Sequence, residues 1–172
     1  NNGILYNMDN ADWINSNSII GDSIAQTQTD ISAIWSAVSA DTSEGFIMKS
    51  IIPDTSYSIF GHNNDTGKTS ADKPVGEGLS FERLSRIWYI DKNGTISPNI
   101  TFDLSDAAEG GAMLDTVNPV ERYVLLYRAD TSGNFSVVDT ADIRINDQIT
   151  FNNVSINEKY YTLGLRGAPE IN

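Results

Sequence analysis

The chain has 172 residues, and 23 Asp and Glu against 11 Lys and Arg give it a formal net charge of −12. So acidic a surface repels phosphate and anionic lipid, and no apolar run reaches the length of a membrane span, so we expect no nucleic-acid partner and no membrane insertion. Cysteine is absent and 40% of the residues are hydrophobic, which excludes disulfides and zinc–thiolate sites but allows a sizeable core.

Taken in chain order, about nine segments have the composition of strands bounded by turn residues. Their spacing predicts an all-β fold, an antiparallel β-sandwich of Ig-like or jelly-roll-like type. We expect a single domain over residues 1–166 and a linker or tail at 167–172. The expected strands cover residues 3–8, 45–52, 57–61, 86–91, 99–104, 122–129, 134–139, 148–156 and 159–166.

Three of these strands carry finer predictions. The Asn93-Gly94 pair is a strong hairpin signal and predicts that 86–91 and 99–104 form a hairpin. In the second of these strands, Ile100, Phe102 and Leu104 alternate and should share one face. Residues 122–129 are mostly apolar, as in a strand covered on both sides.

The segment 24–38 fits two structures. Ile31, Ile34 and Trp35 recur at helical spacing and would allow one short helix. Ile31, Ala33 and Trp35 also alternate with period two, and the many Ser and Thr residues disfavour a helix. Helix and strand both stay open here.

Two long polar connections, 62–82 and 105–121, are the first places to look for a ligand site. Floppy surface loops are an equally good interpretation of them. The segment 61–70 ends in Gly67-Lys68-Thr69 but lacks the first glycine of a phosphate-binding loop.

Catalytic residues are not evident, and we expect no enzymatic activity. The sequence holds one histidine, His62, so any serine–histidine–acid triad would depend on it, and no Gly-x-Ser-x-Gly motif presents a serine. We interpret His62 as a polar turn residue.

No cofactor is expected, although calcium is possible. Asp130, Ser132 and Asn134 alternate around a glycine turn and form a weak candidate calcium site. The turn 91–95 repeats the pattern more weakly. Each turn is equally typical of a hairpin.

Arg83, Arg86 and Trp88 stand together before the Asn-Gly turn as a candidate binding or structural group. Arg86 and Trp88, two apart, should share a strand face, and the guanidinium could pair with an acid such as Glu82 or Asp91. We expect Arg86 to be buried and paired, with the group fixing strand register.

Four stretches, "YSIFGHNNDTG", "RLSRIWYIDKNGTISPNITFDLS", "YVLLYRADTSGNFS" and "YYTLGLR", together resemble a β-rich module of large secreted surface and adhesin proteins of Bacteroidota-type organisms. The resemblance covers about residues 57–165. It implies an extracellular, cell-surface location beside lectin-like domains, and it carries no catalytic residues over to this chain.

The function expected from these observations is that of a non-catalytic structural or adhesive module of a secreted cell-surface protein. Its partners would be neighbouring domains or other copies of itself. One alternative is a filament subunit that donates an N-terminal strand containing Ile4, Leu5 and Tyr6 to its neighbour. Another is a carbohydrate-binding module using Trp88, Tyr89 or the two long loops.

Overall fold

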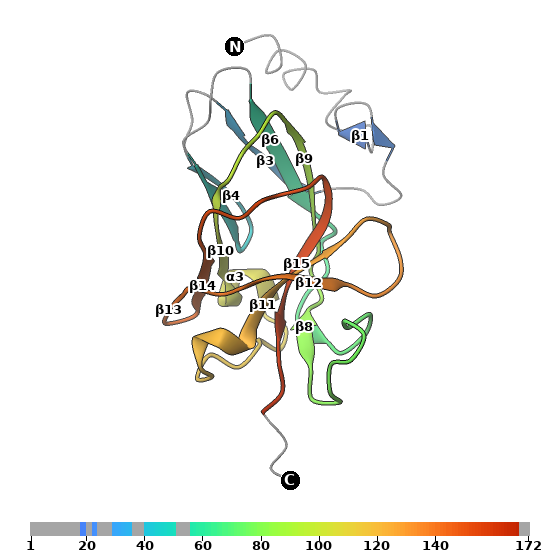
Figure 1. Ribbon diagram of the computed structural model, residues 1–172, viewed down its shortest axis with the longest axis vertical. Helices are drawn as coiled ribbons and strands as arrows, with labels where there is room; N and C mark the ends of the chain where they lie inside the picture. Colours follow the sequence, from blue (N-terminus) through green and yellow to red (C-terminus); the bar gives the residue numbers. More distant parts are fainter. Residues whose placement is uncertain (1–17, 20–21, 24–28, 36–39, 51–55, 169–172) are drawn as a thin grey trace.

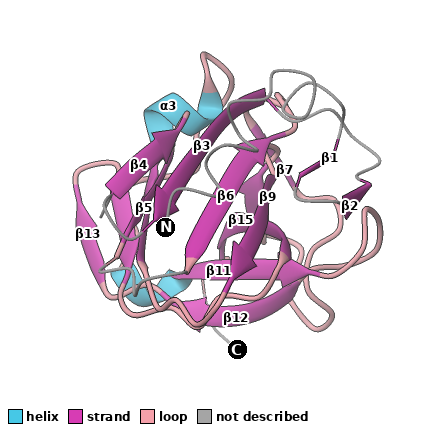
Figure 2. Ribbon diagram, turned by 90° about the horizontal axis from the view of Figure 1, so that it is seen from above, coloured by secondary structure: helices cyan, strands magenta, loops and turns pink. Residues whose placement is uncertain are grey.

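The computed structural model describes residues 18–19, 22–23, 29–35, 40–50 and 56–168. Two antiparallel sheets pack face to face around an apolar core, which confirms the all-β sandwich (Figure 1). Seen from above, β4, β5 and β13 lie on one side and β6, β9, β15, β11 and β12 on the other (Figure 2). No helix among the described residues is long and apolar enough to cross a membrane.

The smaller sheet has five strands, and β10 at its centre shows why the sandwich forms. Ile100 and Phe102 are buried between the sheets whereas Thr101 is half-buried on the outer face, so the predicted alternation is confirmed for these two residues. Leu104 is buried in the same core, but it is the first residue of a helix and not part of the strand. The strand order is β13 (Ile143–Ile145), β14 (Gln148–Phe151), β10 (Asn99–Asp103), β5 (Phe46–Lys49) and β4 (Ala40–Ser43).

The larger sheet has eight strands and is apolar on both faces. In β11, Leu125 belongs to the core between the sheets, and Val124 and Leu126 belong to a second apolar cluster on the opposite face, which confirms a strand covered on both sides. The main order is β12 (Ser136–Thr140), β11 (Tyr123–Arg128), β15 (Lys159–Leu165), β9 (Trp88–Asn93), β6 (Tyr57–His62) and β3 (Thr29–Trp35). Outside this order, β8 (Glu82–Leu84) pairs with β15 and β7 (Lys68–Thr69), and a separate pair joins β1 (Ser18–Ile19) to β2 (Asp22–Ser23).

The predicted hairpin at Asn93-Gly94 is wrong. Strand β9 pairs with β6 and β15, whereas β10 pairs with β5 and β14, so the turn crosses from one sheet to the other. The reason lies in the apolar faces of the two strands. Trp88 and Phe102 meet across the core in a T-shaped arrangement with ring centroids 5.5 Å apart, and pairing of the two strands in one sheet would forgo that contact.

The described part of segment 24–38 is a strand, so a helix there is wrong for residues 29–35; residues 24–28 and 36–38 lie outside the described residues. Ala33 and Ile34 point into the two different apolar clusters, which is the alternation of a strand. A bulge shifts the register of β3 on β6 near Asp30, whose φ is 47°.

Helical turns occur instead in the second long loop. Helix α3 (Leu104–Ala108) begins after Asp103, whose carboxylate accepts the backbone N–H of Asp106 and caps the helix. A single 3-10 turn, η1 (Val120–Arg122), precedes β11.

The two long loops lie against each other rather than apart. The N–H of Gly67 donates to the carbonyl of Ala108 at 3.0 Å, and the N–H of Ser85 donates to the carbonyl of Gly67 at 2.9 Å. A Cβ on Gly111 would lie 2.6 Å from the Cα of Gly67, so the two backbones touch. These contacts hold the two loops against each other, whereas the composition also allowed two floppy surface loops.

Candidate functional site

An irregularity in the sheet places the two arginines. Arg83 pairs with Gly164 and Trp88 pairs with Tyr161 on the neighbouring β15. The chain from β8 to β9 is therefore two residues longer than the part of β15 that it faces. The extra length is taken up at residues 85–87, where the strand is interrupted.

Two backbone carbonyls at this interruption accept hydrogen bonds from a side chain of β15. The buried hydroxyl of Thr162 donates to the carbonyls of Leu84 at 3.3 Å and Arg86 at 2.7 Å. A side-chain donor thus takes the place of a ladder hydrogen bond. The carbonyl of Leu84 also accepts from the guanidinium of Arg83 at 2.8 Å.

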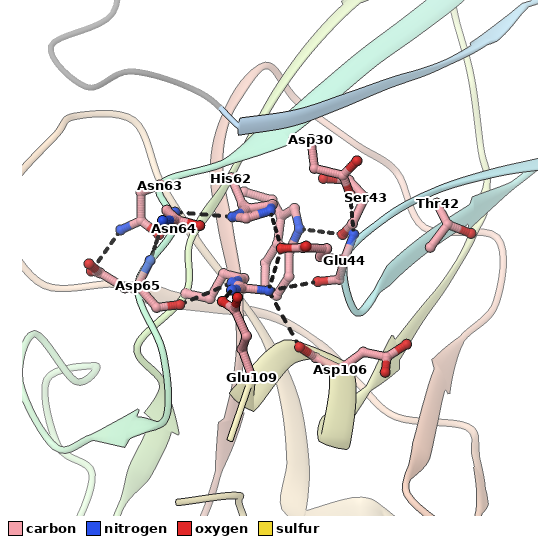
Figure 3. Close-up of polar contacts among 12 residues, drawn as sticks. Asp30, Thr42, Ser43, Glu44, His62, Asn63, Asn64, Asp65, Asp106 and Glu109 are labelled. Atoms are coloured by element: carbon pink, nitrogen blue, oxygen red, sulfur yellow. Dashed lines mark hydrogen bonds and ion pairs between the residues drawn. The ribbon is translucent and has the colours of Figure 1, made fainter. Parts of the chain in front are cut away.

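Arg86 lies at the centre of a network that we call the Arg86 junction, made of Arg86, His62, Glu44 and Glu109. Figure 3 shows His62, Glu44 and Glu109 of this junction turned toward one another. The guanidinium donates to the carbonyls of Asp65 at 3.0 Å, Glu44 at 3.3 Å and Asp106 at 3.4 Å. It also forms ion pairs with the carboxylates of Glu44, at 3.2 Å, and Glu109. The side chain of Arg86 is 0% exposed and the side chains of Glu44 and Glu109 are each 49% exposed, so two acids at the surface cover one buried cation.

The turn between β4 and β5 brings Glu44 into this junction. Gly45 has a φ of 83°, and a Cβ there would lie 2.4 Å from the backbone nitrogen of Ala107, so only glycine allows the turn to lie on α3. On the other side, the carboxylate of Asp30 accepts the N–H of Glu44 at 2.6 Å. The bulge in β3 therefore also positions the junction.

His62 is buried at the end of β6, which corrects its interpretation as a polar turn residue. Its Nδ1 accepts the N–H of Asn64 at 3.0 Å, and its Nε2 lies 3.0 Å from a carboxylate oxygen of Glu44. Because Nδ1 must offer a lone pair, the ring is neutral and carries its proton on Nε2. Burial and then Arg86 lower the pKa of His62, against the opposing charges of Glu44, Asp30 and Glu109.

Trp88 and Tyr89 are unavailable to a ligand. The Nε1–H of Trp88 donates to the carbonyl of Ser43 at 2.9 Å, and its ring stacks on Phe46 with centroids 5.5 Å apart. Trp88 is 0% exposed and Tyr89 is 1% exposed. A sugar-binding platform made of these two rings is therefore excluded, because sugars stack on exposed rings.

Arg83 belongs to a second network, the Arg83–Arg128 cluster, made of Arg83, Arg128, Asp72 and Phe135. Both guanidiniums lie over the ring of Phe135, at 5.0 and 4.4 Å from its centroid. Both donate to the carboxylate of Asp72, at 3.4 and 3.2 Å. Burial lowers the pKa of Arg83, with Arg128 adding to the effect and Asp72 opposing it. The cluster fastens the loop 62–82 to the turn between β11 and β12.

The candidate calcium turn belongs to the margin of this cluster. The guanidinium of Arg128 donates to the carbonyls of Thr131 at 2.8 Å and Gly133 at 3.0 Å in this turn. Two oxygens of the turn thus already face a cation. The residues described form no group of three or more acids or histidines that could hold a metal ion. The three predicted side-chain ligands are exposed: Asp130, Ser132 and Asn134.

The structure thus separates the three residues that the sequence grouped. Arg83 and Arg86 enter different networks, and Trp88 lies in the core. The partner acids Glu82 and Asp91 were wrong choices for Arg86: Glu82 pairs with Lys68 at 2.7 Å. The residues proposed for strand donation, Ile4, Leu5 and Tyr6, lie outside the described residues.

Sequence reasoning missed most members of both networks. Glu44 and Arg86 are 42 residues apart, and Asp72 and Arg128 are 56 apart. No local spacing connects such residues. The one signal in the sequence was the spacing of Arg83 and Arg86. Two residues three positions apart cannot both lie on one face of a regular strand, and this spacing points to an interrupted strand.

The fold and the two networks define the chain as an all-β sandwich with buried arginine–carboxylate clusters. Its sequence matches the family described as Domain of unknown function (DUF8202) over residues 13–160. The chain belongs to this family. No curated protein and no solved structure matched the chain.

Proposed function

We propose that this chain is a non-catalytic structural module of a secreted cell-surface protein. The observation that carries the proposal is the use of the charged side chains in the long loops. Arg83, Arg86 and Arg128 are buried and turned toward backbone carbonyls and carboxylates of the same chain. Groups that are bound in this way fix loops and are not free to bind a substrate.

The state of His62 supports the absence of catalysis. General acid–base chemistry needs a group that reaches the substrate. His62 is 0% exposed, and both of its ring nitrogens contact other groups of the chain. The hydroxyl of Ser43, the nearest serine along the chain to Glu44, is itself buried. The extracellular location is proposed from the acidic surface and the resemblance to secreted modules.

The proposal is tested by measuring stability and activity on the same variants. We expect Arg83→Met and Arg86→Met to lower the free energy of unfolding, and the unmodified chain to show neither hydrolysis of a panel of ester, peptide and glycoside substrates nor binding on a glycan array. Turnover that is lost in His62→Asn, while the fold is retained, would show that the chain is an enzyme and overturn the proposal.

A further inference from the structure

The Arg86 junction contains the single histidine of the sequence. The hydrogen bond from Asn64 occupies the lone pair of its Nδ1, and this is the atom that would take up a second proton. A protonated Nδ1 can only donate. It would therefore face the N–H of Asn64 as donor against donor, and that contact must break.

Burial and the positive charge of Arg86 make the protonated state of His62 costly. Arg86, from the interruption between β8 and β9, shares the carboxylate of Glu44 with His62. Glu44, Asp30 from β3 and Glu109 at the end of α3 act in the opposite direction, because their negative charges favour the protonated ring. Protonation of His62 would place two cations on one carboxylate that is already half exposed to water.

The segment that follows His62 is held to the sandwich by the same junction. The carbonyl of Asp65 accepts from Arg86, and the side-chain oxygen of Asn63 accepts the N–H of Ile87 at 3.0 Å. The N–H of Asn63 also donates to the carbonyl of Ile87 at 3.1 Å. Movement of Asn64 away from the ring would therefore strain the contacts on either side of it.

We propose that the Arg86 junction is an acid-sensitive latch. Uptake of a proton at Nδ1 of His62 expels the N–H of Asn64, and residues 63–67 detach from Ile87 and Arg86. The end of the sandwich where the two long loops meet then opens. Because burial and Arg86 lower the pKa of His62, the opening falls below the ordinary histidine range.

The test uses nuclear magnetic resonance on the whole chain, prepared without a histidine tag so that His62 gives the only imidazole signals. At about pH 7.5 we expect the nitrogen shifts of a neutral ring protonated at Nε2. As the pH falls, we expect the protection of the Asn64 and Ile87 amides against hydrogen exchange to drop at least about tenfold, in step with the titration of His62.

Two controls are available. The Phe135 amide, which donates to the carbonyl of Asp72 at 2.9 Å in the cluster that lacks a histidine, should keep its protection. His62→Asn retains an acceptor for Asn64 and cannot be protonated, so its amides should stay protected. Titration of His62 with no loss of protection at Asn64 and Ile87 would overturn the latch, as would equal loss at Phe135. These readings come from the unmodified chain and hold even if the variant fails to fold.

Discussion

A guanidinium that is removed from water needs an acceptor for each of its N–H groups, and Arg86 finds them in three segments of chain. Replacing it by Met leaves three carbonyls and two carboxylates without their donor. Because the carboxylates of Glu44 and Glu109 can hydrate, we expect a loss near the lower end for a broken buried pair, about 3 kcal/mol. Chemical denaturation followed by circular dichroism measures it.

Lys68→Met is the matched control for Arg86→Met. Lys68 pairs with Glu82 at 2.7 Å, but both side chains are about one-third exposed. An ion pair of this kind contributes less than about 1 kcal/mol. Equal losses in the two variants would mean that the Arg86 junction does not stabilise the fold more than a surface pair does.

His62 should make the stability of the whole chain depend on pH. Its pKa is lower in the folded chain than the ordinary value of 6.5 because of burial and Arg86, so the unfolded chain binds the proton more tightly. This contribution is complete above pH 6.5 and declines as the pH falls from 6.5 toward the folded pKa. Urea denaturation between about pH 7.5 and 5 should show the decline in the unmodified chain and a flatter profile in His62→Asn. Parallel profiles would contradict this.

At the scale of elements, the contact between the two long loops depends on glycine. A Cβ on Gly111 would lie 2.6 Å from the Cα and 2.7 Å from the nitrogen of Gly67, and neither atom belongs to a flexible side chain. We expect Gly111→Ala to separate the loops and cost about 1–3 kcal/mol, as overpacking does. Thermal unfolding is the measurement.

Gly78→Ala distinguishes this steric effect from a general effect of replacing glycine. Nothing lies within 4 Å of a Cβ at Gly78, and its φ is not in the left-handed region. This variant should be neutral or more stable by up to about 1 kcal/mol, because alanine restricts the unfolded chain. If both variants lost stability alike, the contact between the loops would not be the cause.

The interruption between β8 and β9 gives a separate prediction for Thr162. Thr162→Val keeps the shape of the side chain but removes the hydroxyl that donates to the carbonyl of Arg86, which should cost about 1–3 kcal/mol; the carbonyl of Leu84 keeps its bond from Arg83. Thr150→Val is the control, since its half-buried hydroxyl bonds to Thr101 on the outer face and should change stability by less than about 0.5 kcal/mol. Denaturant midpoints of the two variants check the difference.

At the scale of the whole molecule, period-two patterning carried the prediction of the fold. It placed Ile100 and Phe102 correctly because one face of β10 is buried in the core and the other is partly exposed to solvent. The hairpin prediction, which came from the Asn93-Gly94 motif, was wrong because a turn motif fixes the local chain and not the sheet that the next strand joins. Period-two patterning also missed β13, because its three residues are all exposed and show no alternation between a buried and an exposed face.

The candidate site was predictable only in part, for a physical reason. Burial and pairing of Arg86 followed from a charged residue inside an apolar segment. Its partners could not be predicted, because folding brings them to Arg86 from distant parts of the chain. Glu44 comes from a turn and Glu109 from the end of a helix. Two carboxylates that are half exposed look like any other surface acids in a chain with 23 of them.

The two sheets should unfold as one unit, because an aromatic cluster joins them. Phe102 from the five-stranded sheet meets Trp88 from the eight-stranded sheet at 5.5 Å, and Phe46 meets both at 5.5 Å or less. We expect Phe102→Ala to cost about 3–5 kcal/mol. Hydrogen exchange should show the same loss of protection in β14 and in β15, although Phe102 belongs to only one sheet.

Val138→Ala, at a side chain that is 46% exposed on the edge strand β12, is the control and should stay within about 0.5 kcal/mol of the unmodified chain. Loss of protection confined to the five-stranded sheet in Phe102→Ala would show that the sheets are stable separately. Equal loss would mean that the aromatic contacts, and not the turns between the sheets, make the sandwich a single cooperative structure. The arginine networks at its end would then be fastened to a rigid base, as an acid-sensitive latch requires.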